Sequence, residues 1–133
     1  MGVLFSSNEY TPRYNPNEYN KKRPGKNIYN IDNNYVYWRG RKVNGANGLN
    51  FIDYGYGYGK DNKHVFYIGF VLQKTNLHYF RGLENKYAID NTNLYYKGEI
   101  IPNVDANTFK INKDGTAIDK NFKYKNGHKI RRT

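Results

Sequence analysis

A tandem repeat with a period of 29 residues constrains this chain more than any other feature. Four segments align without a gap, and each opens with an aspartate and closes with a glycine. The aspartates are Asp32, Asp61, Asp90 and Asp119, and the glycines are Gly40, Gly69, Gly98 and Gly127. A central aromatic residue recurs at the same step, as Tyr37, Phe66, Tyr95 and Tyr124. Because one short repeat cannot bury its own apolar surface, we expect neighbouring copies to stack.

Each copy is rich in residues that favour β-strands and tight turns. In the third copy, the stretches 87–90, 93–97 and 99–101 carry aromatic and β-branched residues, and Asn91 and Gly98 suit the turns between them. The sequence therefore predicts an all-β fold of tandem 29-residue, three-stranded antiparallel meanders. We expect the meanders to stack as a solenoid or an open, propeller-like array, with a closed barrel as the less favoured alternative.

The repeat divides the chain into two parts. Residues 1–28 contain prolines but no period, which predicts an extended N-terminal arm. Residues 29–133 form the four-copy domain, whose repeats start near Tyr29, Tyr58, Tyr87 and Thr116.

The third copy also carries a resemblance. The run Asp90-Asn-Thr-Asn-Leu-Tyr-Tyr-Lys-Gly98, followed by Asn103-Val-Asp-Ala-Asn-Thr-Phe109, resembles the DKNYY repeat family of bacterial proteins. In the fourth copy, Asp119-Lys-Asn keeps the first three letters of that motif. The resemblance covers roughly residues 29–130 and implies a repeat fold, with no catalytic residues attached to it.

The repeated aspartates are the most tempting metal ligands, because carboxylate oxygens suit calcium. One carboxylate per copy is too few, however, and an Asx turn explains the same Asp-Asn pattern. The three histidines, His64, His78 and His128, do not form a repeated column, and no catalytic motif appears. We therefore expect no enzyme activity, no cofactor and no metal site.

The chain carries a net charge of +11, with basic clusters before the repeats and at the C-terminus. Such a balance favours an acidic partner. No run is long enough for a membrane span, no signal peptide is apparent, and cysteine is absent. These features predict a cytoplasmic protein, with secretion left open because a leader could have been removed.

The function that these features favour is recognition of a macromolecule by one face of the array. Recognition of a protein partner is the first hypothesis, because Trp and Arg are enriched at interaction hot spots, and one such role is that of an immunity-type inhibitor of an effector. A polyanion or single-stranded nucleic acid, and a surface carbohydrate, are the alternatives. The candidate binding residues are Trp38, Arg39, Arg41, Lys21, Lys22 and Arg23.

Overall fold

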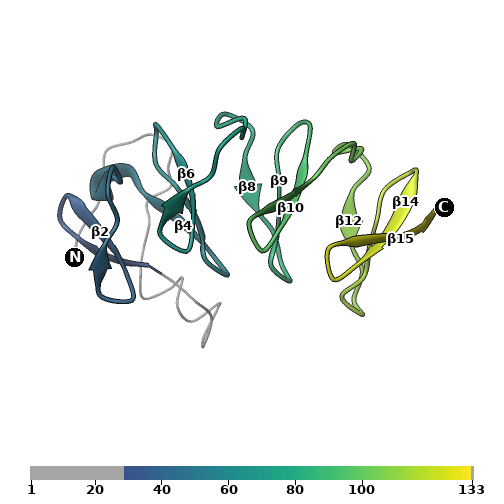
Figure 1. Ribbon diagram of the computed structural model, residues 1–133, viewed down its shortest axis with the longest axis horizontal. Helices are drawn as coiled ribbons and strands as arrows, with labels where there is room; N and C mark the ends of the chain where they lie inside the picture. The colour runs from purple at the N-terminus through teal and green to yellow at the C-terminus, as the bar shows by residue number, and fades with distance from the viewer. Residues whose placement is uncertain (1–28, 133) are drawn as a thin grey trace. The chain divides into compact units, whose positions relative to one another are not determined.

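The computed structural model describes residues 29–132, and these residues are almost entirely β-structure (Figure 1). The one helical segment among them is a short 3-10 turn, η1 (Gly48–Asn50), which Asn47 caps by accepting a hydrogen bond from the Leu49 amide. All strand pairs are antiparallel, and they form four separate small sheets. The described residues thus confirm the all-β class and show four open sheets in place of a closed barrel.

The chain divides into two compact units, residues 1–73 and 74–133, and each unit contains two sheets. The first sheet of the first unit has the order β1-β2-β3, and the second has the order β4-β5-β6-β7. Their strands are β1 (Asn30–Asp32), β2 (Tyr35–Trp38), β3 (Arg41–Lys42), β4 (Ile52–Gly55), β5 (Tyr58–Lys60), β6 (Val65–Tyr67) and β7 (Phe70–Val71).

The second unit contains two four-stranded sheets, with the orders β8-β9-β10-β11 and β12-β13-β14-β15. Their strands are β8 (Arg81–Gly82), β9 (Tyr87–Ile89), β10 (Leu94–Tyr96), β11 (Glu99–Ile101), β12 (Lys110–Ile111), β13 (Ala117–Ile118), β14 (Phe122–Lys125) and β15 (His128–Arg132).

The predicted three-stranded meander describes the first sheet but is wrong for the other three, which have a fourth strand. This strand, β4, β8 or β12, directly follows the phenylalanine that ends the previous copy, and it pairs with the next strand along the chain. Each later sheet therefore begins before its predicted repeat boundary. The reason is that residues 47–50 and their equivalents form only a short turn, and the first strand of the next sheet begins shortly after it.

The repeated glycine sits in the same two-residue hairpin turn in all four copies. Both turn residues have positive φ in each copy, which is the type I′ geometry that matches the twist of the flanking strands. The turn pairs are Arg39-Gly40, Ile68-Gly69, Lys97-Gly98 and Asn126-Gly127. The glycine therefore recurs because the turn requires a positive φ, which glycine adopts without steric cost.

Aromatic rings build the core of each unit, as the scarcity of aliphatic residues implies. In the first unit, Tyr29 lies 4.8 Å from both Trp38 and Phe51, measured between ring centroids. In the second unit, Phe109 lies between Tyr87 and Tyr124, at 5.8 and 5.7 Å. The contact between Phe109 and Tyr124 joins two successive copies, as does that between Phe51 and Phe66, whose ring centroids lie 5.8 Å apart in the first unit. Within each unit the two copies therefore share one core.

Candidate functional site

In the second, third and fourth copies, the repeated aspartate joins two segments of backbone by hydrogen bonds, and we call this arrangement a clasp. One oxygen of Asp90 accepts hydrogen bonds from the backbone amides of Thr92 and Asn93, at 2.9 and 2.8 Å. Asp61 and Asp119 bind the amides two and three residues ahead in the same way, at 2.7–2.8 Å. These hydrogen bonds confirm the Asx-turn interpretation for the three residues.

The second oxygen of each aspartate reaches back fourteen residues to the loop that precedes its sheet. It accepts a hydrogen bond of 2.9 Å from the amide of Asn47, Asn76 or Asp105. This connection was not predicted, although the three loop residues also recur at the 29-residue step. Each clasp therefore ties the loop at the start of a sheet to the turn between its second and third strands.

Two of the clasps include a tyrosine hydroxyl. Tyr95 donates to Asp90 at 2.6 Å, and Tyr124 donates to Asp119 at 2.7 Å. Burial would raise the pKa of both carboxyls, but the hydrogen bonds from Tyr95 or Tyr124 and from the backbone amides outweigh it, so each pKa lies below its ordinary value. Burial and the neighbouring carboxylate raise the pKa of Tyr95 and of Tyr124. The two carboxylates and the two tyrosine hydroxyls are therefore hydrogen-bond partners of each other within the fold.

The first copy departs from this pattern. Asp32 is exposed and ends β1, and Asn33 and Asn34 form the turn. A different aspartate, Asp53 of β4, is fully buried in the first unit, where its oxygens accept hydrogen bonds from the amides of Tyr29 and Gly55, at 2.7 and 2.8 Å. Sequence reasoning missed Asp53 because no other copy has an aspartate in that column.

The turn glycines also hold successive copies together. The Gly69 amide donates to the Tyr29 hydroxyl, and the Gly127 amide donates to the Tyr87 hydroxyl, each at 3.0 Å. A Cβ atom at Gly69 would lie 3.1 Å from Cβ of Trp38, and one at Gly127 would overlap the ring of Tyr96. Gly69 and Gly127 therefore allow a turn to lie directly on an aromatic ring of the copy before it.

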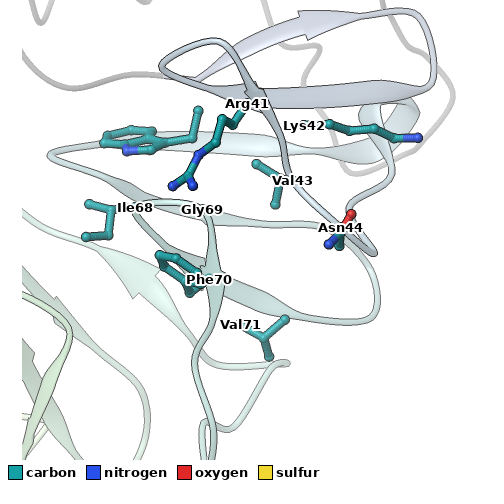
Figure 2. Close-up of a pocket in the computed structure, with 9 residues that line it drawn as sticks. Arg41, Lys42, Val43, Asn44, Ile68, Gly69, Phe70 and Val71 are labelled. Carbon is teal, nitrogen blue, oxygen red and sulfur yellow. The ribbon is translucent and has the colours of Figure 1, made fainter.

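A groove of about 410 Å³ opens where the turn of the second sheet meets the edge of the first (Figure 2). We call it the first-unit groove; its lining residues come from the end of β2, from β3 and the loop after it, and from the β6–β7 turn and β7. The apolar side chains Ile68, Phe70 and Val71 are 36%, 63% and 36% exposed there. The side chain of Arg41 extends toward the turn that carries Ile68 and Gly69 (Figure 2).

The lining of the first-unit groove carries positive charge from Arg41 and Lys42 and contains no aspartate or glutamate. Lys42 extends away from Phe70 (Figure 2), with its ammonium 4.2 Å from the ring centroid of Tyr35. Arg39, in the neighbouring turn, is exposed and lies 5.7 Å from the Trp38 ring centroid. Exposed apolar side chains beside cations are suited to an acidic partner that also has apolar side chains.

Ile68 occupies a strained backbone position. Its φ is +43°, in the left-handed region that a β-branched residue rarely adopts. Arginine, lysine and asparagine stand at the equivalent position in the other copies, as Arg39, Lys97 and Asn126. A residue in this region costs on the order of 1–3 kcal/mol, and such strain gathers at functional sites. Full burial of the side chain does not offset this strain, because Ile68 is 36% exposed.

The second unit has a groove at the equivalent place, lined by Tyr96, Glu99, Ile100, Asn126, Gly127 and His128 among others. Its residues stand 58 positions after their counterparts, since Tyr96 corresponds to Trp38 and Gly127 to Gly69. The apolar turn and edge residues are replaced, however: Asn126 stands for Ile68 and His128 for Phe70. The two grooves share a shape that the repeat imposes, but only the first unit lines it with Ile68 and Phe70.

The structure divides the residues predicted from the sequence to bind. Trp38 is 7% exposed and belongs to the core of the first unit, so only its edge reaches the groove. Arg39 and Arg41 are exposed beside it. Lys21, Lys22 and Arg23 lie outside the described residues. Sequence reasoning missed Ile68 and Phe70, for which the only signal was an apolar residue in columns that are polar in every other copy.

The three histidines do not meet one another at a common site. His64 lies against Phe66, and His78 lies against Tyr79 in an edge contact with centroids 4.8 Å apart. Within residues 29–132, no three His, Cys, Asp or Glu side chains are grouped closely enough to hold a metal ion. In the same part of the chain, no helix combines the length and apolar character that crossing a bilayer requires.

Comparison with known proteins gives one match. A model of the DKNYY family matches residues 14–128, a span that starts within the predicted N-terminal arm. No curated protein and no solved structure matches the chain. Because the family model covers most of the chain, including the clasp aspartates and turn glycines described above, this protein belongs to the DKNYY family.

Proposed function

We propose that this protein is a non-enzymatic binding module whose first-unit groove recognises an acidic protein partner. The observation that carries the proposal is the strained and exposed Ile68, which lies beside the exposed ring of Phe70 in a groove lined by cations. A fold that needed only a tight turn would be served better by asparagine, as at Asn126. The apolar side chain at this position is thus better explained by a contact made outside the chain.

The chemistry of the groove supports a protein partner over a carbohydrate. Sugar recognition commonly uses the open face of an aromatic ring, and Trp38 is the one aromatic residue among the candidate binding residues. Its ring instead packs against Tyr29 and carries Gly69 against its Cβ and Cγ atoms. Interaction hot spots in protein interfaces combine exposed aromatic or aliphatic anchors with arginine, as Phe70, Ile68 and Arg41 do here. Within this class, inhibition of an acidic effector is the specific role that we favour.

A photo-crosslinking amino acid at position 70 tests where the partner binds. In cells of the native source, position 70 should crosslink to one predominant acidic protein, identified by mass spectrometry. Leu49, which is 48% exposed in the same unit but outside the groove, is the matched control position and should give no such product. Equal crosslinking from both positions would show that the groove is not the site.

The substitution Ile68→Asn then separates binding from folding. Relief of the strained turn should raise the free energy of unfolding by about 1 kcal/mol. The same substitution should weaken binding to the purified crosslinked partner by about tenfold, measured by calorimetry, because an interface anchor is lost. Lys97→Asn is the control in the second unit, at the equivalent turn, and should leave the affinity unchanged. An Ile68→Asn protein that binds as tightly as the wild type contradicts the proposal.

A further inference from the structure

The last sheet presents cations on the face that carries apolar residues in the earlier copies. In the third copy, Leu94 and Tyr96 occupy this face of β10 and belong to the core that the second unit shares with Ala117 and Tyr124. The fourth copy has Lys123 and Lys125 at the equivalent positions of β14. Lys123 is half-buried and Lys125 is exposed. The face that would receive a fifth copy is therefore cationic.

The strand register gathers further basic residues onto this face. Arg131 pairs with Lys123, and His128 pairs with Lys125, on either side of an irregularity in the register between Lys123 and Tyr124. Paired side chains share the same side of the sheet. On the other side of Lys123, Ile118 and then Lys110 continue the same row across the sheet. We define the basic face by these residues: Lys110, Ile118, Lys123, Lys125, His128 and Arg131. His128 lies at the border of this face, because it also lines the groove of the second unit with Glu99. Strands β14 and β15 contain no aspartate or glutamate.

The carboxylates in the turns of this sheet do not neutralise the basic face as a whole. Asp119 is buried and accepts hydrogen bonds from Tyr124 and the amides of Asp105, Asn121 and Phe122. Asp114 is bound chiefly by the hydroxyl and amide of Thr116, with Lys123 as a weaker neighbour, and these contacts lower its pKa.

A simple solubilising cap does not explain a single sign of charge. A sheet face that no further copy covers needs polar residues, and mixed charges would supply them. Lys123 and Arg131 instead lie directly opposite each other, an arrangement that destabilises an antiparallel pair. A partner that brings negative charge would relieve the repulsion between these two residues.

We propose that the basic face is a binding site for single-stranded nucleic acid. Alternate residues of a strand lie about 6.6 Å apart on one face, which places the cations in rows able to follow an extended phosphate backbone. The exposed imidazole of His128 and the half-buried side chain of Ile118 offer surfaces for bases between those rows. A lipid surface would need exposed apolar side chains as well as cations, and Ile130 of β15 is 48% exposed, so vesicles are included in the test as a competing outcome.

On the other face of the same hairpin, two further cations pack on an aromatic ring. The Lys129 ammonium and the Arg132 guanidinium lie 4.3 and 5.0 Å from the ring centroid of Phe122. These two residues cover a ring that would otherwise be available for base stacking. The basic face is thus distinct from the rest of the C-terminal charge, and variants within it can be tested separately.

The test measures binding of a fluorescently labelled oligothymidylate by fluorescence anisotropy across a range of salt concentrations. About four phosphate contacts should give a slope near −3 for log K against log salt concentration. The double substitution Lys123→Gln with Arg131→Gln should weaken binding by about tenfold at low salt and reduce the magnitude of that slope by about 1.4. Thermal unfolding should show that this variant folds at least as stably, because a repulsive pair has been removed.

The control variant Lys63→Gln with Arg81→Gln removes one lysine and one arginine that are exposed on other sheets. It should keep the wild-type affinity and slope. Equal losses of affinity in both double variants would show that binding depends only on net charge, and would overturn the assignment. Tighter binding to a DNA duplex, to polyglutamate or to vesicles containing phosphatidylserine would also overturn it, as would no binding to the oligothymidylate at low salt.

Discussion

At the scale of single residues, one column of aspartates illustrates how a short polar side chain can organise a repeat. Asp90 accepts hydrogen bonds from the amides of Asn76, Thr92 and Asn93 and from the hydroxyl of Tyr95. Both oxygens are needed, because one faces the turn and the other faces the loop. The pattern explains why the residue recurs in a chain where most polar positions vary from copy to copy.

The substitution Asp90→Asn should lower the free energy of unfolding by about 1–3 kcal/mol, because the amide group places a donor where the clasp needs an acceptor. Chemical denaturation measured by tyrosine fluorescence would check this. Glu84→Gln, at an exposed bend in the same unit, is the matched control and should change stability by no more than about 0.5 kcal/mol. Similar effects of the two substitutions would contradict the assigned role of the clasp.

At the scale of elements, the alternation of apolar residues and the glycine column were enough to predict the three core strands of each copy. The strand before them was missed for a physical reason. Its members, β4, β8 and β12, have no common pattern, since Arg81–Gly82 and Lys110–Ile111 are only two residues long. Their pairing depends on the loop clasp, a contact across fourteen residues that local propensity does not register.

The candidate site was harder to predict than the strands. Trp38, which Arg39 and Arg41 follow in the sequence, was predicted to bind, but a ring from its own copy and a turn from the next copy cover it. Ile68 and Phe70 could not be predicted as groove residues from the sequence, because the type I′ turn determines which side chains face the groove. Burial of this kind depends on the stacking of copies, which no single repeat encodes.

A pair of glycine substitutions tests that stacking. Gly127→Ala and Gly40→Ala place a Cβ at the same φ of +83°, which costs about 1–2 kcal/mol in either turn. Only Gly127 lies against a ring, that of Tyr96, whereas a Cβ at Gly40 meets nothing within 4 Å. Gly127→Ala should therefore cost about 1–3 kcal/mol more than Gly40→Ala in thermal or chemical unfolding. Equal costs would mean that the turn does not pack on the ring as described.

At the scale of the whole molecule, the chain consists of two units, each with its own aromatic core. The second unit holds three carboxyls whose pKa is lowered: Asp90 and Asp119, where hydrogen bonds outweigh burial, and the exposed Asp114. The stability of this unit is therefore tied to pH, and Asp90 and Asp119 are the two of these carboxyls that belong to clasps. The ordinary pKa of each carboxyl is 3.8, and the folded state releases the proton more readily than the unfolded state does.

The sign of this linkage predicts acid lability of the second unit. The stabilisation is complete above the ordinary pKa and is lost as the pH falls through the lower value of the folded state. Hydrogen exchange followed by NMR at pH 6 and below pH 4 should show amides of β10 and β14 losing protection at the lower pH. The double variant Asp90→Asn with Asp119→Asn should lose the part of that pH dependence that these two carboxyls supply and keep the part that Asp114 supplies. Protection that rises on acidification would be inconsistent with the hydrogen bonds assigned to these carboxylates.

The fixed spacing of the aspartate clasp limits how a chain of this kind can change in length. Residues 47–61, 76–90 and 105–119 are each closed into a ring of set size by one hydrogen bond. An insertion inside such a ring would pull the carboxylate off its loop amide, whereas residues 44–46 and their equivalents lie outside every ring. Relatives should therefore grow or shrink by whole 29-residue modules, or vary at that one short stretch between them.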